Sequence, residues 1–429
     1  MLPVVIAVFQ FIRYTDNKEY LFECERRFTD MLKGKTVLLG VTGGIAAYKA
    51  AALASVLVKN HAQVDVIMTK HAEKFITPLT FEHLTARKVY TDIFERFNAN
   101  EVAHIALAER ADLVIVAPAT ANVCAKFAHG IADDMLTSTV LACKCPKLIA
   151  PAMNTNMWEN PVTQDNLEIL RHYGWIVIPP ASGRLACGSI GMGKLPEPEM
   201  LMQYVLREVA FPHDLKGRRV LVTAGPTQEP LDPVRFLSNR SSGKMGYAIA
   251  KIAMLRGAEV TLITGKTALE PPLFTEVIPV TSAEDMFRAV TAYFEDSDFI
   301  IKAAAVADYT PTEVADNKIK KKDGDMFIPL KRTQDILKYL GENRRKEQVI
   351  VGFSMESENV LENSRAKLTK KNVDMICAND VKQAGAGFQV DTNILTLITA
   401  EDTRQLPLLT KEEAAVTLLD RAMELADNR

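Results

Sequence analysis

The stretch Thr36-Val-Leu-Leu-Gly-Val-Thr-Gly-Gly-Ile-Ala-Ala-Tyr-Lys-Ala-Ala-Ala-Leu-Ala54 decides the fold of the first half of the chain. Its apolar run over 36–41 predicts a buried strand, Gly43 and Gly44 predict a turn, and the alanine-rich run over 45–54 predicts a helix. This order opens a nucleotide-binding βαβ unit, because backbone N–H groups at the helix start can bind a phosphate. The glycine spacing is not GxGxxG, so the motif alone does not specify a dinucleotide.

Strands and helices alternate through the rest of the first half. Apolar runs predict strands at 64–68, 112–117, 147–150 and 175–178. Helical patterns predict helices at 104–108, 121–128, 132–143, 159–173 and 198–209. Regular alternation of this kind predicts a parallel sheet with helices on both faces, which is a doubly wound α/β domain.

The chain then restarts with the same order of features. Lys216-Gly-Arg-Arg-Val-Leu-Val-Thr-Ala-Gly-Pro-Thr227 matches Lys33-Gly-Lys-Thr-Val-Leu-Leu-Gly-Val-Thr-Gly-Gly44 in its basic start, apolar run and glycine turn. We therefore predict two doubly wound, Rossmann-like domains at 33–210 and 218–429, joined by a linker at 211–217. In the second domain we predict strands at 259–264, 298–306, 348–353 and 373–377, an added hairpin strand at 388–398, and helices at 244–256 and 411–426.

The composition is that of a soluble globular protein. Of 429 residues 48% are hydrophobic and 24% charged, and a net charge of −2 gives no reason to expect nucleic-acid or membrane binding. Six scattered cysteines without a CxxC pair, and only seven histidines, predict a cytoplasmic protein with no disulfide framework or structural metal site. The apolar run at 2–12 is too short to span a bilayer and lacks the basic start of a signal peptide. We interpret residues 1–32 as an extension or a mis-assigned start and give them no function.

Pro151-Ala-Met-Asn-Thr-Asn-Met-Trp-Glu-Asn160 follows a predicted strand, at the carboxyl end where open α/β sheets bind ligands. The Asn154 amide can donate and accept hydrogen bonds without carrying a charge. An apolar wall against a flat cofactor could be formed by Met153, Met157 and Trp158. The alternative is a buried strand followed by a plain helix cap, with Asn160-Pro161 starting the next helix.

The segment Pro179-Pro-Ala-Ser-Gly-Arg-Leu-Ala-Cys-Gly-Ser-Ile-Gly-Met-Gly193 predicts a long loop, because it is rich in proline and glycine. A loop of this length inside a compact domain is usually a lid or disordered. Cys187 within it has two interpretations that the residues alone leave open. It is either a small core side chain or a functional thiol on a mobile lid.

Two stretches of the second half suit anionic ligands. Asn239-Arg-Ser-Ser-Gly-Lys-Met-Gly246 places serines and glycines at a helix start, although Met245 after the lysine excludes a P-loop. Lys318-Ile-Lys-Lys-Lys-Asp-Gly-Asp325 is a basic run that closes on a turn. It is either a solvated hairpin edge or a flap that carries positive charge over phosphates.

The motifs taken together resemble two known families. The first half resembles the flavin-dependent cysteine decarboxylases in Gly43–Lys49, His104, Pro118-Ala-Thr-Ala-Asn122, Pro151–Trp158 and Ala186–Gly193. The second half resembles phosphopantothenate–cysteine ligase in Thr223–Thr227, Ser238–Gly246, Ala303–Asp308, Lys318–Lys321 and Ala378–Asp380. Both on one chain resemble the bifunctional bacterial coenzyme A biosynthesis family, over about residues 33 to 427.

The first resemblance implies an FMN-dependent decarboxylation of 4′-phosphopantothenoyl-cysteine to 4′-phosphopantetheine. Oxidation of the substrate thiol to a thioaldehyde makes an electron sink, CO2 then leaves, and reduction and protonation complete the reaction. The resemblance assigns proton donation to Cys187, orientation of the substrate carboxylate to Asn154, and the base or its support to His104. It assigns FMN binding to Gly43, Ile45, Thr69, Pro118, Ala119, Thr120, Ala121 and Asn122.

The second resemblance implies ligation of L-cysteine to 4′-phosphopantothenate, with CTP as co-substrate and an acyl-cytidylate intermediate. Lysines and Mg²⁺ should stabilise the charge on phosphate oxygens, although the sequence does not identify metal ligands. Lys318 would be catalytic and Asn239 would handle the acyl-cytidylate. CTP binding is assigned to Ala303, Ala304, Asp308, Lys318, Asp335, Ile336, Phe353, Lys367 and Lys371. The last two lie four apart on a predicted helix and so share one face.

The resemblance also implies homo-oligomers, with flavin sites between the subunits of trimers and a dimeric ligase half. Three departures from the family pattern concern Lys194-Leu195, Thr333-Gln334 and Lys302. They affect the expected contacts of the lid and the cytosine pocket. One alternative is a two-domain dehydrogenase that uses a dinucleotide. It is disfavoured because the sequence lacks GxGxxG and the acidic residue that would bind a ribose. Another, a non-catalytic flavoprotein subunit, is disfavoured by the retention of His104, Asn154 and Cys187.

Overall fold

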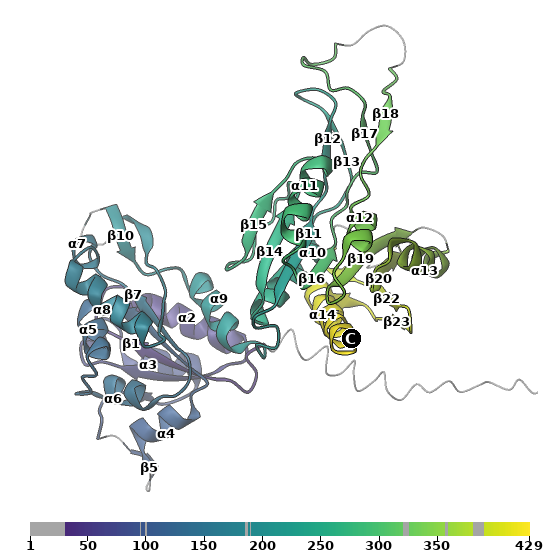
Figure 1. The fold of residues 1–429 in the computed structure, drawn as a ribbon. Helices are drawn as coiled ribbons and strands as arrows, with labels where there is room; N and C mark the ends of the chain where they lie inside the picture. The colour runs from purple at the N-terminus through teal and green to yellow at the C-terminus, as the bar shows by residue number, and fades with distance from the viewer. Residues whose placement is uncertain are drawn as a thin grey trace, which may run out of the picture. The chain divides into compact units, whose positions relative to one another are not determined.

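The computed structural model describes residues 31–94, 96–98, 101–184, 188, 190–320, 326–356, 359–380 and 390–429. Cys187, Lys321 and residues 1–30 lie outside these ranges. The chain divides into two compact units, one ending at Pro212 and the other including His213–Arg429. Figure 1 draws both units, each with a sheet between helices.

The sheet of the first unit has six parallel strands in the order β3-β2-β1-β6-β7-β8. The strands are β1 Thr36–Val41, β2 Gln63–Met68, β3 Val89–Tyr90, β6 Leu113–Ala119, β7 Lys147–Pro151 and β8 Ile176–Val177. If the six strands of this sheet are numbered by their order in the chain, they lie side by side as 3-2-1-4-5-6, which is the order of the dinucleotide-binding fold. The direction of winding reverses between β1 and β6. The prediction of a doubly wound parallel sheet is confirmed.

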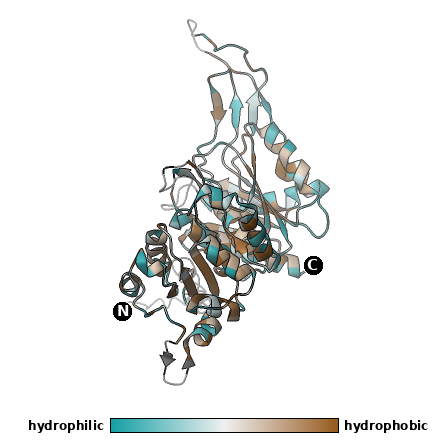
Figure 2. Ribbon diagram, turned by 90° about the vertical axis from the view of Figure 1, so that its left-hand side faces the viewer, coloured by the Kyte–Doolittle hydropathy of each residue, from teal (hydrophilic) through white to brown (hydrophobic). Residues whose placement is uncertain are grey.

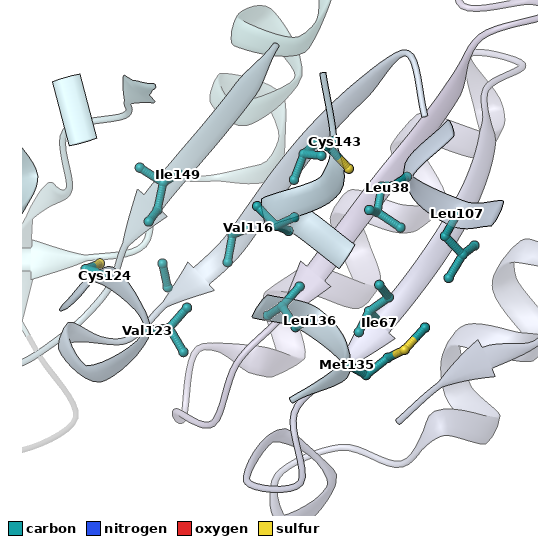
Figure 3. Close-up of a cluster of buried hydrophobic side chains, with 14 of the residues drawn as sticks. Leu38, Ile67, Leu107, Val116, Val123, Cys124, Met135, Leu136, Cys143 and Ile149 are labelled. Carbon is teal, nitrogen blue, oxygen red and sulfur yellow. The ribbon is translucent and has the colours of Figure 1, made fainter. Parts of the chain in front are cut away.

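Helices cover this sheet because its strands are apolar on both faces, as the wholly buried β1 and β6 illustrate. The helices are α2 Ala47–Lys59, α3 Pro78–Thr85, α4 Ala103–Arg110, α5 Ala121–Ala128, α6 Met135–Ala142, α7 Thr155–Trp158, α8 Pro161–His172 and α9 Pro198–Val209. Figure 3 shows the core on one face, where Leu107, Val123 and Leu136 from α4, α5 and α6 meet strand residues such as Val116.

The second unit has eight strands in the order β15-β14-β11-β16-β19-β20-β22-β23. Six are parallel, and β22 and β23 add an antiparallel pair at one edge. The strands are β11 Arg219–Ala224, β14 Glu259–Thr264, β15 Glu276–Pro279, β16 Phe299–Lys302, β19 Val349–Glu356, β20 Met375–Asp380, β22 Leu395–Thr399 and β23 Thr403–Gln405. The parallel part has the same winding order as the first sheet, so the predicted second Rossmann-like domain with an added hairpin is confirmed.

The helices of the second unit are α10 Lys244–Leu255, α11 Ala283–Phe294, α12 Ile336–Asn343, α13 Val360–Lys371 and α14 Lys411–Asp427. They combine apolar and polar faces, whereas the strands are mainly hydrophobic (Figure 2). Two antiparallel ribbons extend beyond the sheet (Figure 1) and contact each other through β12 and β17. Their strands are β12 Gln228–Pro230, β13 Phe236–Ser238, β17 Tyr309–Pro311 and β18 Leu330–Arg332.

Several elements differ from the predicted bounds, and three examples follow. The helix expected at 159–173 begins only at Pro161, because Asn160 caps it with its side chain and proline takes the first turn. The loop expected at 179–193 contains an antiparallel pair, β9 Ala181–Arg184 and β10 Ile190–Lys194. The strand expected at 298–306 ends at Lys302, after which the chain turns away with Ala305 still bridged to Pro226. The strand predicted at 388–398 lies partly outside the described residues.

Candidate active sites

The loops after β1 and β6 are joined where the winding of the first sheet reverses. The Thr42 hydroxyl donates to the carbonyl of Pro118 at 2.8 Å, and the backbone N–H of Thr120 donates to that hydroxyl at 3.0 Å. Thr120 also caps α5, because its hydroxyl accepts from Val123 N at 3.3 Å. These bonds fix the carboxyl-end crevice in which doubly wound sheets bind ligands.

A cavity of about 710 Å³ opens at this point, and we call it the switch-point cavity. Its lining includes Gly43, Gly44, Ile45, Lys49, Pro118, Thr120, Ala121, Met153, Asn154, Met157, Arg184, Lys194 and Leu195. Ile45 and Met157 are 62% and 48% exposed, so they offer apolar surface to a ligand. A side chain at Gly43 would come within 2.4 Å of His71 Cβ, so the turn requires glycine there. An apolar wall beside the start of a helix suits a flat ring that carries a phosphate.

Asn154 caps a helix and also lines the switch-point cavity. Its side-chain oxygen caps the short helix α7 by accepting from Asn156 N at 2.9 Å, and the residue also lines the switch-point cavity. The β9–β10 ribbon is held against this loop, because Met153 N donates to the carbonyl of Gly193 at 3.0 Å. A Cβ on Gly193 would lie 2.2 Å from Met153 O, so only glycine permits this approach.

The structure brings together only part of the residues expected around the flavin. Gly43, Ile45, Pro118, Thr120, Ala121 and Asn154 line the cavity. Four others do not: Thr69 accepts from Ala72 N, Ala119 is completely buried, Asn122 is exposed, and His104 lies on α4. Trp158, expected in the apolar wall, packs against the core cluster instead. The Nδ1 atom of His104 is buried without a hydrogen-bond partner among the described residues.

The contact of Lys49, in the lining of the cavity, with Glu197 was not predicted from the sequence. Lys49 is 8% exposed, and its ammonium group donates to Glu197 at 2.7 Å and to the Leu195 carbonyl at 3.3 Å. This hydrogen bond from Lys49 holds the pKa of the Glu197 carboxyl below its usual value. The pair ties α2 to the segment before α9, and a lysine in an alanine-rich helix gave no signal of this contact.

Two adjoining cavities lie at the carboxyl ends of the strands of the second unit. The α10 cavity, of about 400 Å³, includes Asn239, the start of α10 at 241–246, residues 302–306, Asn379 and Lys411. The α13 cavity, of about 470 Å³, includes residues 332–337, Lys367 and Lys371. The two share Lys302, Val306, Asp308 and Phe353.

Nearly all residues expected to bind CTP lie in these cavities. Asp308, Asp335, Ile336, Phe353, Lys367 and Lys371 line the α13 cavity, and Ala303, Ala304, Asp308 and Phe353 line the α10 cavity. Lys367 and Lys371 share one face of α13, as their spacing predicted. Asn239 also lines the α10 cavity, and its amide donates to the Ala305 carbonyl at 3.1 Å. Lys318 lines neither cavity.

Four basic and two acidic side chains line the α13 cavity, so its lining is net positive. Lys371 pairs with Asp335, and Lys367 donates to the Ser354 hydroxyl at 3.0 Å. Burial alone would raise the pKa of Asp335, but the hydrogen bond from Lys371 holds it below its usual value. Burial lowers the pKa of Lys302, and the nearby carboxylates of Asp335 and Asp308 act in the opposite direction.

Comparison with known proteins decides the family. Residues 25–210 match the flavoprotein family, and residues 215–425 match the C-terminal domain of DNA/pantothenate metabolism flavoproteins. The coenzyme A biosynthesis bifunctional protein CoaBC of Bacillus subtilis (strain 168) is 49% identical over 402 residues, which cover 92% of this chain and 98% of that protein. The chain belongs to the bifunctional coenzyme A biosynthesis proteins. It therefore carries a flavoprotein decarboxylase half and a ligase half.

Solved structures similar to the chain match one half each. The crystal structure of the C-terminal domain of a coenzyme A biosynthesis bifunctional protein CoaBC is 46% identical, with 50% of this chain and 98% of that chain covered and a TM-score of 0.43. The FMN binding protein AtHal3 is 34% identical, with 40% and 95% covered and a TM-score of 0.37.

The described residues contain neither a cluster of metal-ligating side chains nor a membrane-spanning helix. Within those ranges no group of three or more histidine, cysteine, aspartate or glutamate side chains is placed to hold a metal ion. None of the helices in the same ranges is long and apolar enough to cross a membrane.

Proposed function

We propose that the flavin of the decarboxylase half is FMN and that it binds in the switch-point cavity. The cavity joins an apolar wall to the glycine turn before α2, which offers backbone N–H groups to a phosphate. FMN would be held by Gly43, Ile45, Pro118, Thr120 and Ala121. When bound, FMN supplies the oxidation of the substrate thiol and the later return of the electrons.

The residues of the chain hold the substrate and move its proton. Asn154 orients the carboxylate of 4′-phosphopantothenoyl-cysteine, since its amide lines the cavity without adding negative charge. Cys187 donates a proton to the carbon left after CO2 departs, and the β9–β10 ribbon that leads to it is held against the Asn154 loop. Without this proton donor the intermediate could not proceed to product. Replacement of Cys187 should therefore allow CO2 release but block product formation.

The flavin sites lie between subunits of a trimer in this proposal. His104 does not line the switch-point cavity of its own chain, and its buried Nδ1 atom has no partner in the described part of the chain. A neighbouring copy that covers α4 would bring His104 to a flavin and give Nδ1 its partner. Exposed Val102 and Ile105 flank it and offer apolar surface for such a contact.

In the ligase half, CTP occupies the α13 cavity and the acyl substrate occupies the α10 cavity. Lys367, Lys371 and Lys302 supply positive charge for the triphosphate, with Mg²⁺ as the expected counter-ion. Asn239, in the lining of the α10 cavity, faces the acyl-cytidylate. Lys318 reaches the phosphates from its ribbon, either by movement of that ribbon or from the second copy of a dimer. The scattered cysteines support a reducing, cytoplasmic location.

The observation that carries this proposal is that cavities lie at the carboxyl ends of the strands in both of two sheets with the same winding. The test begins with the purified protein, which should be yellow and release FMN on denaturation. From CTP, 4′-phosphopantothenate and cysteine it should also form CMP and, through 4′-phosphopantothenoyl-cysteine, 4′-phosphopantetheine. Lys318→Gln should abolish ligation and leave decarboxylation of supplied 4′-phosphopantothenoyl-cysteine unchanged. A colourless protein, or equal loss of both activities in this variant, contradicts the proposal.

A further inference from the structure

Asn379 ends the buried part of β20 with an unmatched hydrogen-bond acceptor. The residue is 6% exposed, and its Oδ1 atom has no hydrogen-bond partner in the described part of the chain. Buried acceptors of this kind are rare in folded proteins, because each loses its water without compensation. An acceptor left in this state at a binding site indicates a ligand that supplies the donor.

The direction of the side chain follows from the strand. Ile376 packs with Leu337 and Leu368 in the core beneath α12 and α13. Successive side chains of a strand alternate between faces, so Asn379, three residues further on, lies on the opposite face. Its neighbour across the ladder is Met355, and both residues line the α10 cavity. The acceptor therefore belongs to that cavity and is absent from the lining of the α13 cavity.

We propose that Asn379 is a substrate-binding residue of the ligase half, whose Oδ1 accepts a hydrogen bond from an N–H or O–H group in the α10 cavity. This inference rests on the proposed function, which puts the nucleotide in the α13 cavity. The remaining substrates offer two sources of a donor. One is the amide or hydroxyl of the pantothenoyl chain, and the other is the amine of cysteine.

Removal of the acceptor should have opposite effects on the stability of the free protein and on the binding of substrate. Asn379→Leu has similar volume and takes away a group that is unsatisfied in the free protein, so the unfolding temperature should stay the same or rise. With substrate bound, the same change leaves a donor without its acceptor. Ligation should then lose roughly 10- to 100-fold in kcat/KM, the range for a hydrogen bond to a neutral or charged donor.

Ser364 provides a matched control. Its hydroxyl is also buried and without a partner among the described residues, but it lies on α13 and lines neither cavity. Ser364→Ala should therefore leave ligation unchanged. Asn379→Ser serves as a second variant, because truncation to a smaller side chain cannot overfill the site.

The experiment measures two steps on the full-length protein. Pyrophosphate release from CTP and 4′-phosphopantothenate without cysteine reports acyl-cytidylate formation, and product formation with cysteine reports the complete ligation. Loss of the first step in both Asn379 variants assigns the donor to the pantothenoyl chain. An intact first step with a raised KM for cysteine assigns it to the amine.

Three results overturn the inference. They are unchanged ligation in both variants, a change confined to the KM for CTP, or an equal fall when Ser364 is replaced. If the proposed function itself is wrong, the unaltered protein will show no CTP-dependent ligation. That result differs from a failure of the Asn379 inference alone.

Discussion

The carboxylate of Asp232 accepts a hydrogen bond from the backbone N–H of Ile319, with Oδ2 at 3.1 Å from the nitrogen. Arg235 completes the contact, because its guanidinium donates to the same oxygen at 2.9 Å and to the Ile319 carbonyl at 2.8 Å. The Asp232 side chain is fully buried, and the hydrogen bond from Arg235 holds its pKa well below the usual range. The backbone immediately after Lys318 is thereby fixed to a turn of the β12–β13 ribbon.

Asp232→Asn tests whether this contact positions Lys318. The amide keeps the shape but weakens the bonds to Arg235 and Ile319, so ligation should fall at least about tenfold while decarboxylation is unchanged. If Asp232 acts only through Lys318, adding Asp232→Asn to Lys318→Gln should cause little further loss. Additive losses in this double-mutant cycle would assign Asp232 a separate structural role.

Asp402→Asn is the matched control for that cycle. Like Asp232, Asp402 accepts hydrogen bonds from arginine, here from Arg404 and Arg421, and it also accepts one from the Thr399 hydroxyl. It lines neither cavity of the ligase half. Its replacement should leave the kcat/KM of ligation within about twofold of the unaltered protein, as expected for a substitution away from the site.

Asn154→Asp should reduce decarboxylation at least about a hundredfold, because it sets a negative charge against the substrate carboxylate in a partly desolvated cavity. Aspartate caps a helix as well as asparagine does, so the bond to Asn156 N and the start of α7 should survive. The variant therefore isolates the charge. Steady-state assays and the flavin spectrum check it, and a colourless variant would instead make Asn154 part of the flavin site.

Cys187→Ser should release CO2 once and then stall with reduced flavin, because a serine hydroxyl is a far weaker acid than a thiol. Rapid-mixing absorbance and quantified CO2 measure the single turnover. Cys145→Ser is the control, since Cys145 is half-buried in the same unit and lies outside the switch-point cavity. Sustained formation of 4′-phosphopantetheine by the Cys187 variant would exclude it as the proton donor.

The sequence predicted the two sheets because their signals are local. Runs such as Thr36–Val41 and Glu259–Thr264 are rich in apolar and β-branched residues, and the structure has strands with those bounds. The segment after Pro179 was predicted as a loop, since its glycines favour no regular structure. Its pairing into β9 and β10 depends on contact with Met153, which is distant in sequence.

The candidate sites were predictable where residue type and strand end coincide, as at Gly43 and Asp308. Lys302 was noted only as a departure from the family pattern, yet it lines both cavities of the ligase half. Asn379 was part of a motif but gave no sign of an unsatisfied acceptor. Burial and hydrogen-bond satisfaction arise from tertiary packing, so no local pattern could have revealed either role.

We predict that Lys411, at the start of α14, makes substrate binding depend on pH. It lines the α10 cavity, donates to the Val390 carbonyl, and is 5% exposed. Burial and the charge of Lys244 lower its pKa to about 8, although Asp391 acts in the opposite direction. Because this folded-state value lies below the ordinary 10.5, the unfolded chain binds more protons between these pH values. Stability from this group should therefore rise with pH across that window.

Binding of 4′-phosphopantothenate should reverse this shift. An anion in the cavity favours charged Lys411, so binding near pH 8 should take up a proton, and the Kd should rise by up to about tenfold per pH unit above pH 8. The phosphate is almost fully ionised above pH 7, so its own titration does not confuse the result. Calorimetry at pH 8 in two buffers of different ionisation enthalpy measures the uptake.

Lys411→Arg stays charged and should bind tightly with no proton uptake, whereas Lys411→Met should bind weakly at every pH. Equal proton uptake in Lys411→Arg and in the unaltered protein would place the titrating group elsewhere.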